Sequence, residues 1–173
     1  MPKATSSRVH RKEGETSPPF TVEVSTHLAL TPEQAFPYFT DPERHVQWMG
    51  TEATLDPVPL GTYWVRMPDG FGVAGTYLSV DPPHQVAFTW GFADADAAGH
   101  VKGEAPEGNP MPAGSTRVTV LLSAEQKGTR LTLRHENLPT AELRDGNKLG
   151  WETYLDRLAV RTSGGDPPPD PHS

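Results

Sequence analysis

The chain contains no cysteine. Disulfide-stapled scaffolds, thiolate metal sites and thiol catalysis are therefore excluded. The sequence also lacks any run approaching the ~20 apolar residues of a membrane-spanning helix. Its early basic residues, from Lys3 to Lys12, are not followed by the apolar stretch of a signal peptide. We therefore expect a cytoplasmic protein with no membrane span.

Basic residues are in deficit, because 15 Lys and Arg face 22 Asp and Glu for a net charge of −7. A surface that neutralises a row of phosphates needs the opposite balance, so a nucleic-acid partner is not expected. The seven histidines are scattered without metal-ligand spacing, and the glycine motifs of nucleotide-binding proteins are missing. The sequence predicts no metal site and no cofactor.

Proline and glycine are abundant instead, with 19 and 16 residues among 173. They gather in three stretches that show no hydrophobic period. These stretches predict a disordered arm over 1–19, a long loop over 93–115 and a disordered Pro-rich tail over 163–173. Most apolar residues, including all four Trp, lie in the remaining 20–162, which we interpret as one domain.

Apolar and polar residues alternate along this domain in a way that predicts strands over 20–28, 51–56, 61–67, 72–80, 85–92, 117–123 and 129–136. Thr31 and Asp41, each followed by proline, predict the starts of two short helices after the first strand. Thr140 can cap a long final helix. The order predicts an α+β fold, in which a curved antiparallel sheet of about six to seven strands wraps around the C-terminal helix and leaves a pocket beside it.

Several short motifs occur in an order that resembles a known superfamily. They are Phe39-Thr40-Asp41-Pro42-Glu43 with Trp48, Gly61-Thr62-Tyr63-Trp64, the run from Pro82 to Trp90, the run from Gly128 to His135, and Gly150-Trp151 with Tyr154-Leu155. Together they are similar to the helix-grip proteins of the SRPBCC type, which include START and Bet v 1-like proteins. The branch they resemble is that of the activator of heat-shock protein 90 ATPase homologue-like proteins, over residues 20–160.

The resemblance implies a helix-grip fold and several functions. Members of the superfamily bind lipids, sterols or polyketides, some cyclise or dehydrate polyketides, and the eukaryotic namesake stimulates a chaperone ATPase. The sequence departs from the family pattern at Asn147, where many relatives carry His, and in the length of the 93–115 loop. Fold-level analogy does not choose among these functions.

Eight residues are candidates for ligand binding. Apolar surface would come from Trp48, Met67, Phe88, Trp90 and Trp151, and orientation from His135, Asn147 and Tyr154. His135 ends a strand on the inward parity, where an imidazole can act as acid, base or hydrogen-bonding group. The alternative is a structural histidine that a backbone carbonyl or Tyr154 satisfies. Each aromatic residue has the corresponding alternative of plain core packing. We assign no catalytic residue.

The favoured hypothesis is binding of a hydrophobic or amphipathic small molecule, lipid or polyketide-like, between the sheet and the last helix. Two alternatives stay open. One is an enzyme of the cyclase or dehydratase kind, which would need a buried acid or base facing the cavity. The other is a co-chaperone that stimulates the heat-shock protein 90 ATPase through an outer surface, with a chaperone as partner.

Overall fold

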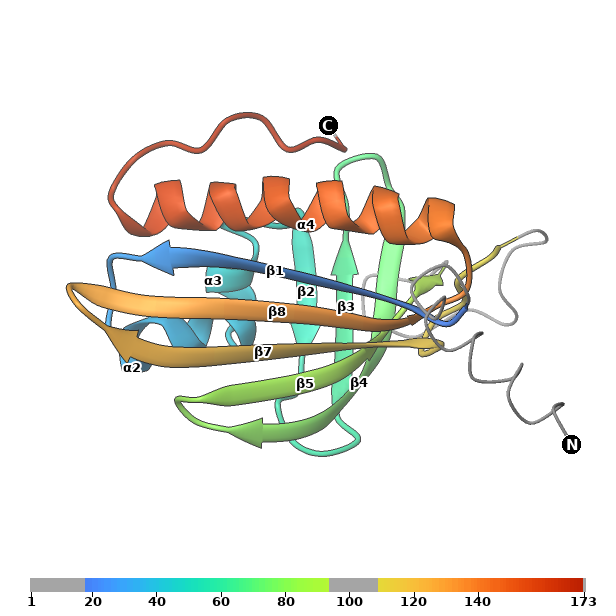
Figure 1. Cartoon of the computed structure of the whole chain (residues 1–173), viewed down its shortest axis with the longest axis horizontal. Helices are drawn as coiled ribbons and strands as arrows, with labels where there is room; N and C mark the ends of the chain where they lie inside the picture. The colour runs from blue at the N-terminus through green and yellow to red at the C-terminus, as the bar shows by residue number, and fades with distance from the viewer. Residues whose placement is uncertain (1–17, 94–108, 173) are drawn as a thin grey trace, which may run out of the picture.

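A computed structural model describes residues 18–93 and 109–172 of the chain (Figure 1). Most of the predicted arm, and the greater part of the predicted 93–115 loop, lie outside the described residues. The described residues form an eight-stranded sheet and a long C-terminal helix that lies across one of its faces. The expected helix-grip fold is confirmed, with one more strand than the sequence predicted because a two-residue strand follows Trp90.

The element order matches the predicted one, except that the first of the two predicted short helices is an α-helix followed directly by a 3₁₀ helix and that the strand β6 is added. The first strand β1 (Phe20–Leu28) leads into three short helices, and strands then alternate with turns up to the last helix α4 (Ala141–Thr162). The remaining elements are α2 (Pro32–Ala35), η2 (Phe36–Phe39), α3 (Pro42–His45), β2 (Glu52–Leu55), β3 (Thr62–Arg66), β4 (Gly72–Asp81), β5 (Gln85–Trp90), β6 (Phe92–Ala93), β7 (Thr116–Glu125) and β8 (Gly128–Leu138).

The predicted helix starts carry the expected caps. The Thr31 hydroxyl accepts a hydrogen bond from the Gln34 amide, and the Gln34 side chain accepts from the Thr31 amide, which completes a capping box. Asp41 accepts from the amide of Glu43 in the same way. Thr140 caps α4 by accepting from the Leu143 amide at 3.1 Å. Local polar side chains thus fix where these helices begin.

All ladders of the sheet are antiparallel, in the order β1-β8-β7-β5-β4-β3-β2, and β6 pairs with β4. The sheet curves, so α4 packs against β1 and β8 on its inner face while the short helices fill the other end (Figure 1). The buried residues of α4 are Trp151, Tyr154, Leu155 and Leu158. Within the described ranges, no helix combines the length and the hydropathy needed to cross a membrane.

The opposite, outer face of the sheet carries a smaller cluster around Trp64, which is fully buried. Ala74, Ala93 and Ala113 pack on its indole, and the Arg66 guanidinium lies 5.5 Å from the ring centroid. The chain segments on either side of 94–108 meet here. The Phe92 amide donates to the Met111 carbonyl at 2.7 Å, and the Asn109 side chain donates to the Phe92 carbonyl at 2.9 Å.

Residues 163–172 run back along α4 rather than away from it (Figure 1). The Tyr154 hydroxyl donates to Asp170 at 2.6 Å, and the Arg157 guanidinium donates to the Pro168 carbonyl. The sequence predicted a disordered tail because this segment has no apolar side chain to anchor it. In the structure, polar groups of the helix hold the segment instead.

Candidate functional site

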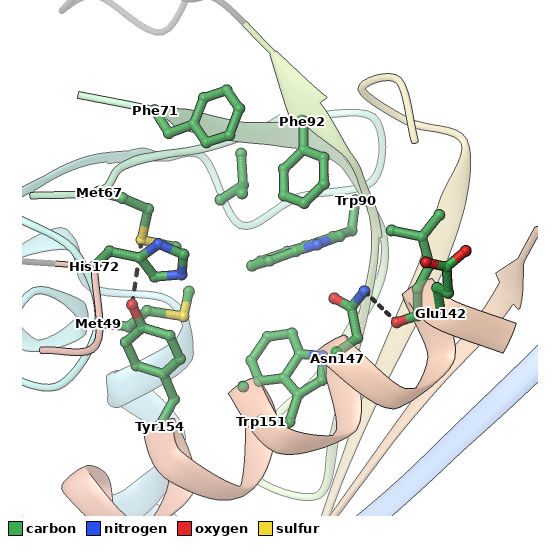
Figure 2. Close-up of a pocket in the computed structure, with 14 residues that line it drawn as sticks. Met49, Met67, Phe71, Trp90, Phe92, Glu142, Asn147, Trp151, Tyr154 and His172 are labelled. Atoms are coloured by element: carbon green, nitrogen blue, oxygen red, sulfur yellow. Dashed lines mark hydrogen bonds between the residues drawn. The ribbon is translucent and has the colours of Figure 1, made fainter. Parts of the chain in front are cut away.

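A cavity of about 220 Å³ lies between the sheet and the first half of α4 (Figure 2). Five parts of the chain contribute to it: the turn after α3, the β3–β4 hairpin, the β5–β6 segment, one stripe of α4 and the segment after α4. The lining residues are Met49, Met67, Phe71, Val73, Trp90, Phe92, Glu142, Leu143, Gly146, Asn147, Gly150, Trp151, Tyr154 and His172.

The walls of this pocket are mainly aromatic. The indoles of Trp90 and Trp151 lie 4.9 Å apart at an interplanar angle of 51°. The rings of Phe71 and Phe92 stack at 5.4 Å and 3°. Flat rings with polarised faces suit an apolar ligand that also contains rings.

Few polar groups line the pocket, and they differ in whether their hydrogen-bonding atoms already have partners. The Asn147 amide nitrogen donates to the Leu143 carbonyl at 2.8 Å, and Figure 2 shows the amide oxygen turned away from that carbonyl, toward the interior of the pocket. That oxygen is an available acceptor. The indole N–H of Trp90 is buried and has no hydrogen-bond partner among the described residues. This nitrogen has less than 1 Å² of accessible surface, so it does not face the cavity.

The Tyr154 hydroxyl, by contrast, is already engaged. It donates to the Asp170 carboxylate at 2.6 Å and lies 3.7 Å from the Met67 sulfur. Burial raises the pKa of Tyr154 well above its usual range, and the Asp170 hydrogen bond raises it further. The phenol is therefore neutral, and its proton is held by the segment after α4.

The same C-terminal segment also forms part of the pocket wall. The imidazole of His172 stacks on the Tyr154 ring at 6.2 Å and 9°, and its Nδ1 lies 3.3 Å from the carboxylate of Asp69 in the β3–β4 hairpin. Sequence reasoning missed both Asp170 and His172, because short polar residues in a Pro-rich tail carry no pattern that places them.

Five of the eight predicted ligand-binding residues line the pocket: Met67, Trp90, Asn147, Trp151 and Tyr154. Their role in binding stays a prediction. Trp48 and Phe88 lie in the closed core instead. The Trp48 indole donates to the Tyr38 carbonyl at 3.1 Å, and Phe88 stacks on Tyr63 with 4.1 Å between ring centroids. Both side chains are buried in the main hydrophobic core.

His135, the third predicted residue outside the pocket, lies behind Trp151. The Trp151 indole donates to His135 Nδ1 at 3.0 Å, so Nε2 carries the proton toward the Thr116 hydroxyl at 2.8 Å. That hydroxyl in turn donates to the Trp90 carbonyl at 2.7 Å. Burial lowers the pKa of His135 to about 3, so the ring is neutral. Its partners are Trp151 and Thr116, rather than the backbone carbonyl or Tyr154 of the structural alternative, and its role in binding stays a prediction.

Another buried histidine, His45, was not singled out from the sequence. Its Nε2 lies 2.9 Å from the Tyr63 hydroxyl, and its Nδ1 lies 3.4 Å from the Met49 carbonyl. Because the carbonyl can only accept, Nδ1 carries the proton and Nε2 accepts from Tyr63. Burial lowers the pKa of His45 to about 4. This histidine belongs to the core and does not line the pocket.

The residues that the sequence predictions did not name fall into two kinds. Glu142, Leu143, Gly146 and Gly150 share the helical stripe of Asn147 and Trp151, so the 3.6-residue period could have found them. Phe92 shares the face of Phe88 and Trp90 in the predicted strand 85–92, so the period of two indicated it, whereas Phe71 comes from the turn between β3 and β4, where no period applies. Among the described residues, no group of three or more His, Asp or Glu lies close enough to hold a metal ion.

Comparisons with solved structures place this fold among known ones. The chain is similar to DynU16, a protein in the dynemicin biosynthetic locus, at 21% identity and a TM-score of 0.68, over 85% of this chain and 48% of that one. It therefore spans about half the length of DynU16. It is similar to CalU16 from Micromonospora echinospora at 23% identity and a TM-score of 0.63, over 83% and 76% of the two chains.

A third solved structure has a higher sequence identity to this chain. It is an AHSA1-like protein from Rhizobium etli, with 36% identity, a TM-score of 0.61, and coverage of 88% of this chain and 87% of that one. No protein of curated function matches the chain. The model of the Activator of Hsp90 ATPase homolog 1-like protein family matches residues 29–162. The chain therefore belongs to the Activator of Hsp90 ATPase homolog 1-like family.

Proposed function

We propose that this protein binds a small hydrophobic or amphipathic molecule in the pocket between its sheet and α4. The observation that carries the proposal is an aromatic-walled cavity into which the amide oxygen of Asn147 is directed (Figure 2). A few polar groups in an apolar cavity are typical of ligand sites, in which they set orientation.

The size of the cavity limits the ligand. An apolar cavity of about 150 Å³ accepts benzene, so a volume of about 220 Å³ suits a molecule of one or two rings. The stacked walls favour a polyketide-like ring system over a long acyl chain. The similarity to DynU16, from a biosynthetic locus, agrees with a small-molecule ligand.

Binding is better supported than the two alternatives. The enzyme hypothesis needs an acid or base that faces the cavity, but His135 is paired on both nitrogens behind Trp151, and Tyr154 is held by Asp170. The co-chaperone hypothesis draws on the family name alone. Neither has a particular contact of this molecule in its favour.

Titration with three probes tests the proposal: 1-tetralone, 2-naphthol and decanoate. Changes in the chemical shifts of backbone amides and of the indole N–H groups, measured by NMR, report where each probe binds. We expect 1-tetralone and 2-naphthol to shift Trp90, Asn147 and Trp151 and to bind more tightly than decanoate. Phe92→Ala, which removes half of the stacked pair, should weaken binding about fivefold to tenfold.

Leu78→Ala is the matched control, since Leu78 is 40% exposed on β4 and does not line the pocket. It should leave the affinity unchanged. The proposal fails if none of the probes perturbs pocket residues up to its solubility limit. It also fails if the perturbed residues gather elsewhere on the surface.

A further inference from the structure

The hydrogen-bond donors of the pocket's aromatic residues are already engaged or turned away from the cavity. The Trp151 indole donates to His135 at 3.0 Å, and the Tyr154 hydroxyl donates to Asp170 at 2.6 Å. The Trp90 indole nitrogen has less than 1 Å² of accessible surface. A ligand in the pocket therefore meets no free donor on these three side chains.

The first free acceptor is the amide oxygen of Asn147. The Leu143 carbonyl can only accept, so the amide atom 2.8 Å from it is the nitrogen, and this contact fixes the orientation of the amide. The oxygen is left pointing into the pocket (Figure 2), and no described residue donates to it. It is available to a donor on a ligand.

The second free acceptor is Nε2 of His172. The other ring nitrogen, Nδ1, lies 3.3 Å from the Asp69 carboxylate, which can only accept when ionised. In the neutral ring, the form in which histidine ordinarily occurs at pH 8, Nδ1 therefore carries the proton and Nε2 accepts. The ring stacks on Tyr154 at 6.2 Å and 9°, and Figure 2 shows its free edge turned toward the cavity.

The two acceptors are separated by the length of a small ring system. Asn147 and Tyr154 are seven residues apart on α4, which is about 10 Å along the helix axis, and His172 lies against Tyr154. Trp151 lies between these two positions on the helix and supplies a flat wall. Glu142 also lines the pocket, from the exposed end of the same stripe, and its carboxylate is a third group that accepts.

We infer that the pocket selects ligands that bring hydrogen-bond donors, and that Asn147 and His172 determine this specificity. The inference rests on the proposed function and narrows the ligand to an aromatic ring compound with a hydroxyl group at each end. A ketone in place of a hydroxyl would set its oxygen against an acceptor, and both groups would lose water without gaining a partner. A carboxylate would in addition be repelled by Glu142.

Three probes with one ring system test this inference: naphthalene, 2-naphthol and 2,6-dihydroxynaphthalene, titrated at pH 8. Each added hydroxyl should tighten binding about threefold to tenfold, the contribution of one hydrogen bond. Hydrophobic burial alone would give the opposite order, because each hydroxyl favours water. 1-Tetralone, whose oxygen only accepts, should bind more weakly than 2-naphthol.

Two variants test the residues. Asn147→Leu removes the first acceptor, and His172→Phe removes the second while a ring stays against Tyr154. In either variant 2,6-dihydroxynaphthalene should lose its advantage over 2-naphthol, because one acceptor remains for two hydroxyls. The advantage is a ratio measured within each variant, so a general change in the fit of the ring system does not affect it. A ratio equal to that of the wild type would contradict the role given to that residue.

The chain offers a matched control for each variant. His84→Phe makes the same change in the β4–β5 turn, where His84 is exposed and does not line the pocket. Lys148→Leu places leucine next to Asn147 on the exposed side of α4. Both should keep the wild-type ratio.

Two results separate this inference from the proposed function. If the probes perturb pocket residues but their affinities do not rise with the number of hydroxyls, or 1-tetralone binds as tightly as 2-naphthol, the inference is overturned and the proposed function stands. If no probe binds the wild type, the proposed function fails and the inference falls with it.

Discussion

Two aromatic regions of this molecule are built from the same residue types and differ in what faces them. In the closed region, beneath the short helices, the rings of Tyr63, Tyr77 and Phe88 stack or meet edge to face. The Tyr77 hydroxyl donates to the Phe39 carbonyl at 2.8 Å. In the open region, Trp90, Trp151 and Phe92 surround a cavity, and the Trp90 N–H has no partner within the described chain.

The difference comes from the facing element rather than from the sheet. Phe39 and Trp48 project large rings into the closed region, with 5.4 Å between their centroids. The stripe of α4 over the open region contains Gly146 and Gly150. Aromatic content alone therefore does not distinguish the pocket from the closed core. What distinguishes the pocket is the absence of large side chains opposite the aromatic residues.

The largest expected contrast between the regions is in stability. Phe88→Ala should lower the free energy of unfolding by about 3–5 kcal/mol, because it opens a cavity in a fully packed site. Phe92→Ala should cost about 1 kcal/mol or less, since its ring is half-buried and already borders empty space. Urea denaturation of both variants measures the difference. Equal losses would show that the two regions are packed alike.

In the response to acid, the two regions should instead behave alike. His45 and His135 are both buried and neutral, with pKa values lowered from the usual 6.5 to about 4 and about 3. The unfolded chain takes up protons below pH 6.5 and the folded chain does not, so stability is complete above that pH and falls as the pH drops toward those values. Each histidine should lower the free energy of unfolding by about 2 kcal/mol when the pH falls from 8 to 5.

Glutamine separates the two contributions. In His135→Gln the amide can still accept from Trp151 and donate to Thr116 without taking up a proton, and His45→Gln is its counterpart in the closed region. Urea denaturation at pH 8 and pH 5 measures how much the free energy of unfolding changes with pH. In each variant this change should be smaller by the contribution of the histidine that was replaced. If His135→Gln kept the full pH dependence, His135 would not contribute to it. The imidazole of the wild type would then have an ordinary pKa in the folded protein, which requires contact with water from the pocket.

A smaller effect is expected from the contact that closes the open region. Tyr154→Phe removes the hydroxyl that donates to Asp170, and should lower the free energy of unfolding by about 0.5–1.5 kcal/mol. It should also increase amide hydrogen exchange in residues 166–172, which would lose this attachment to the helix. Unchanged exchange there would mean that the Arg157 contact alone holds the segment.

The smallest effect belongs to the outer side of α4. Leu149 is 67% exposed and does not line the pocket. Leu149→Ala should change the free energy of unfolding by no more than about 0.5 kcal/mol, in either direction, as is usual for surface positions. A loss of more than about 1 kcal/mol by the same urea measurement would show that this helix is supported from both sides.

The sequence was sufficient for the fold because its signals are local. The caps at Thr31, Asp41 and Thr140 and the alternation along the strands depend on neighbouring residues only. The pocket was harder to predict, as Phe88 and Trp90 show. They share one face of β5, yet Phe88 stacks on Tyr63 and Trp90 lines the cavity. A period of two gives the face of a strand, but not which helix lies over each position.

His135 and the C-terminal segment show the same limit for polar groups. The inward parity of His135 was predicted correctly, but its partners, Thr116 and Trp151, come from a neighbouring strand and from α4. The contacts of Asp170 and His172 are to residues 16 and 103 positions away along the chain. Hydrogen bonds across such distances leave no periodic trace in a sequence.

The junction at Phe92 also makes the molecule convenient to engineer. The backbone on the two sides of 94–108 is joined by hydrogen bonds among Phe92, Asn109 and Met111, next to the buried Trp64 cluster. Because the two ends are already held together, exchanging the residues between them adds little loop-closure entropy. Because Phe92 also lines the pocket, a reporter domain or an affinity tag joined at this junction would be attached next to the pocket.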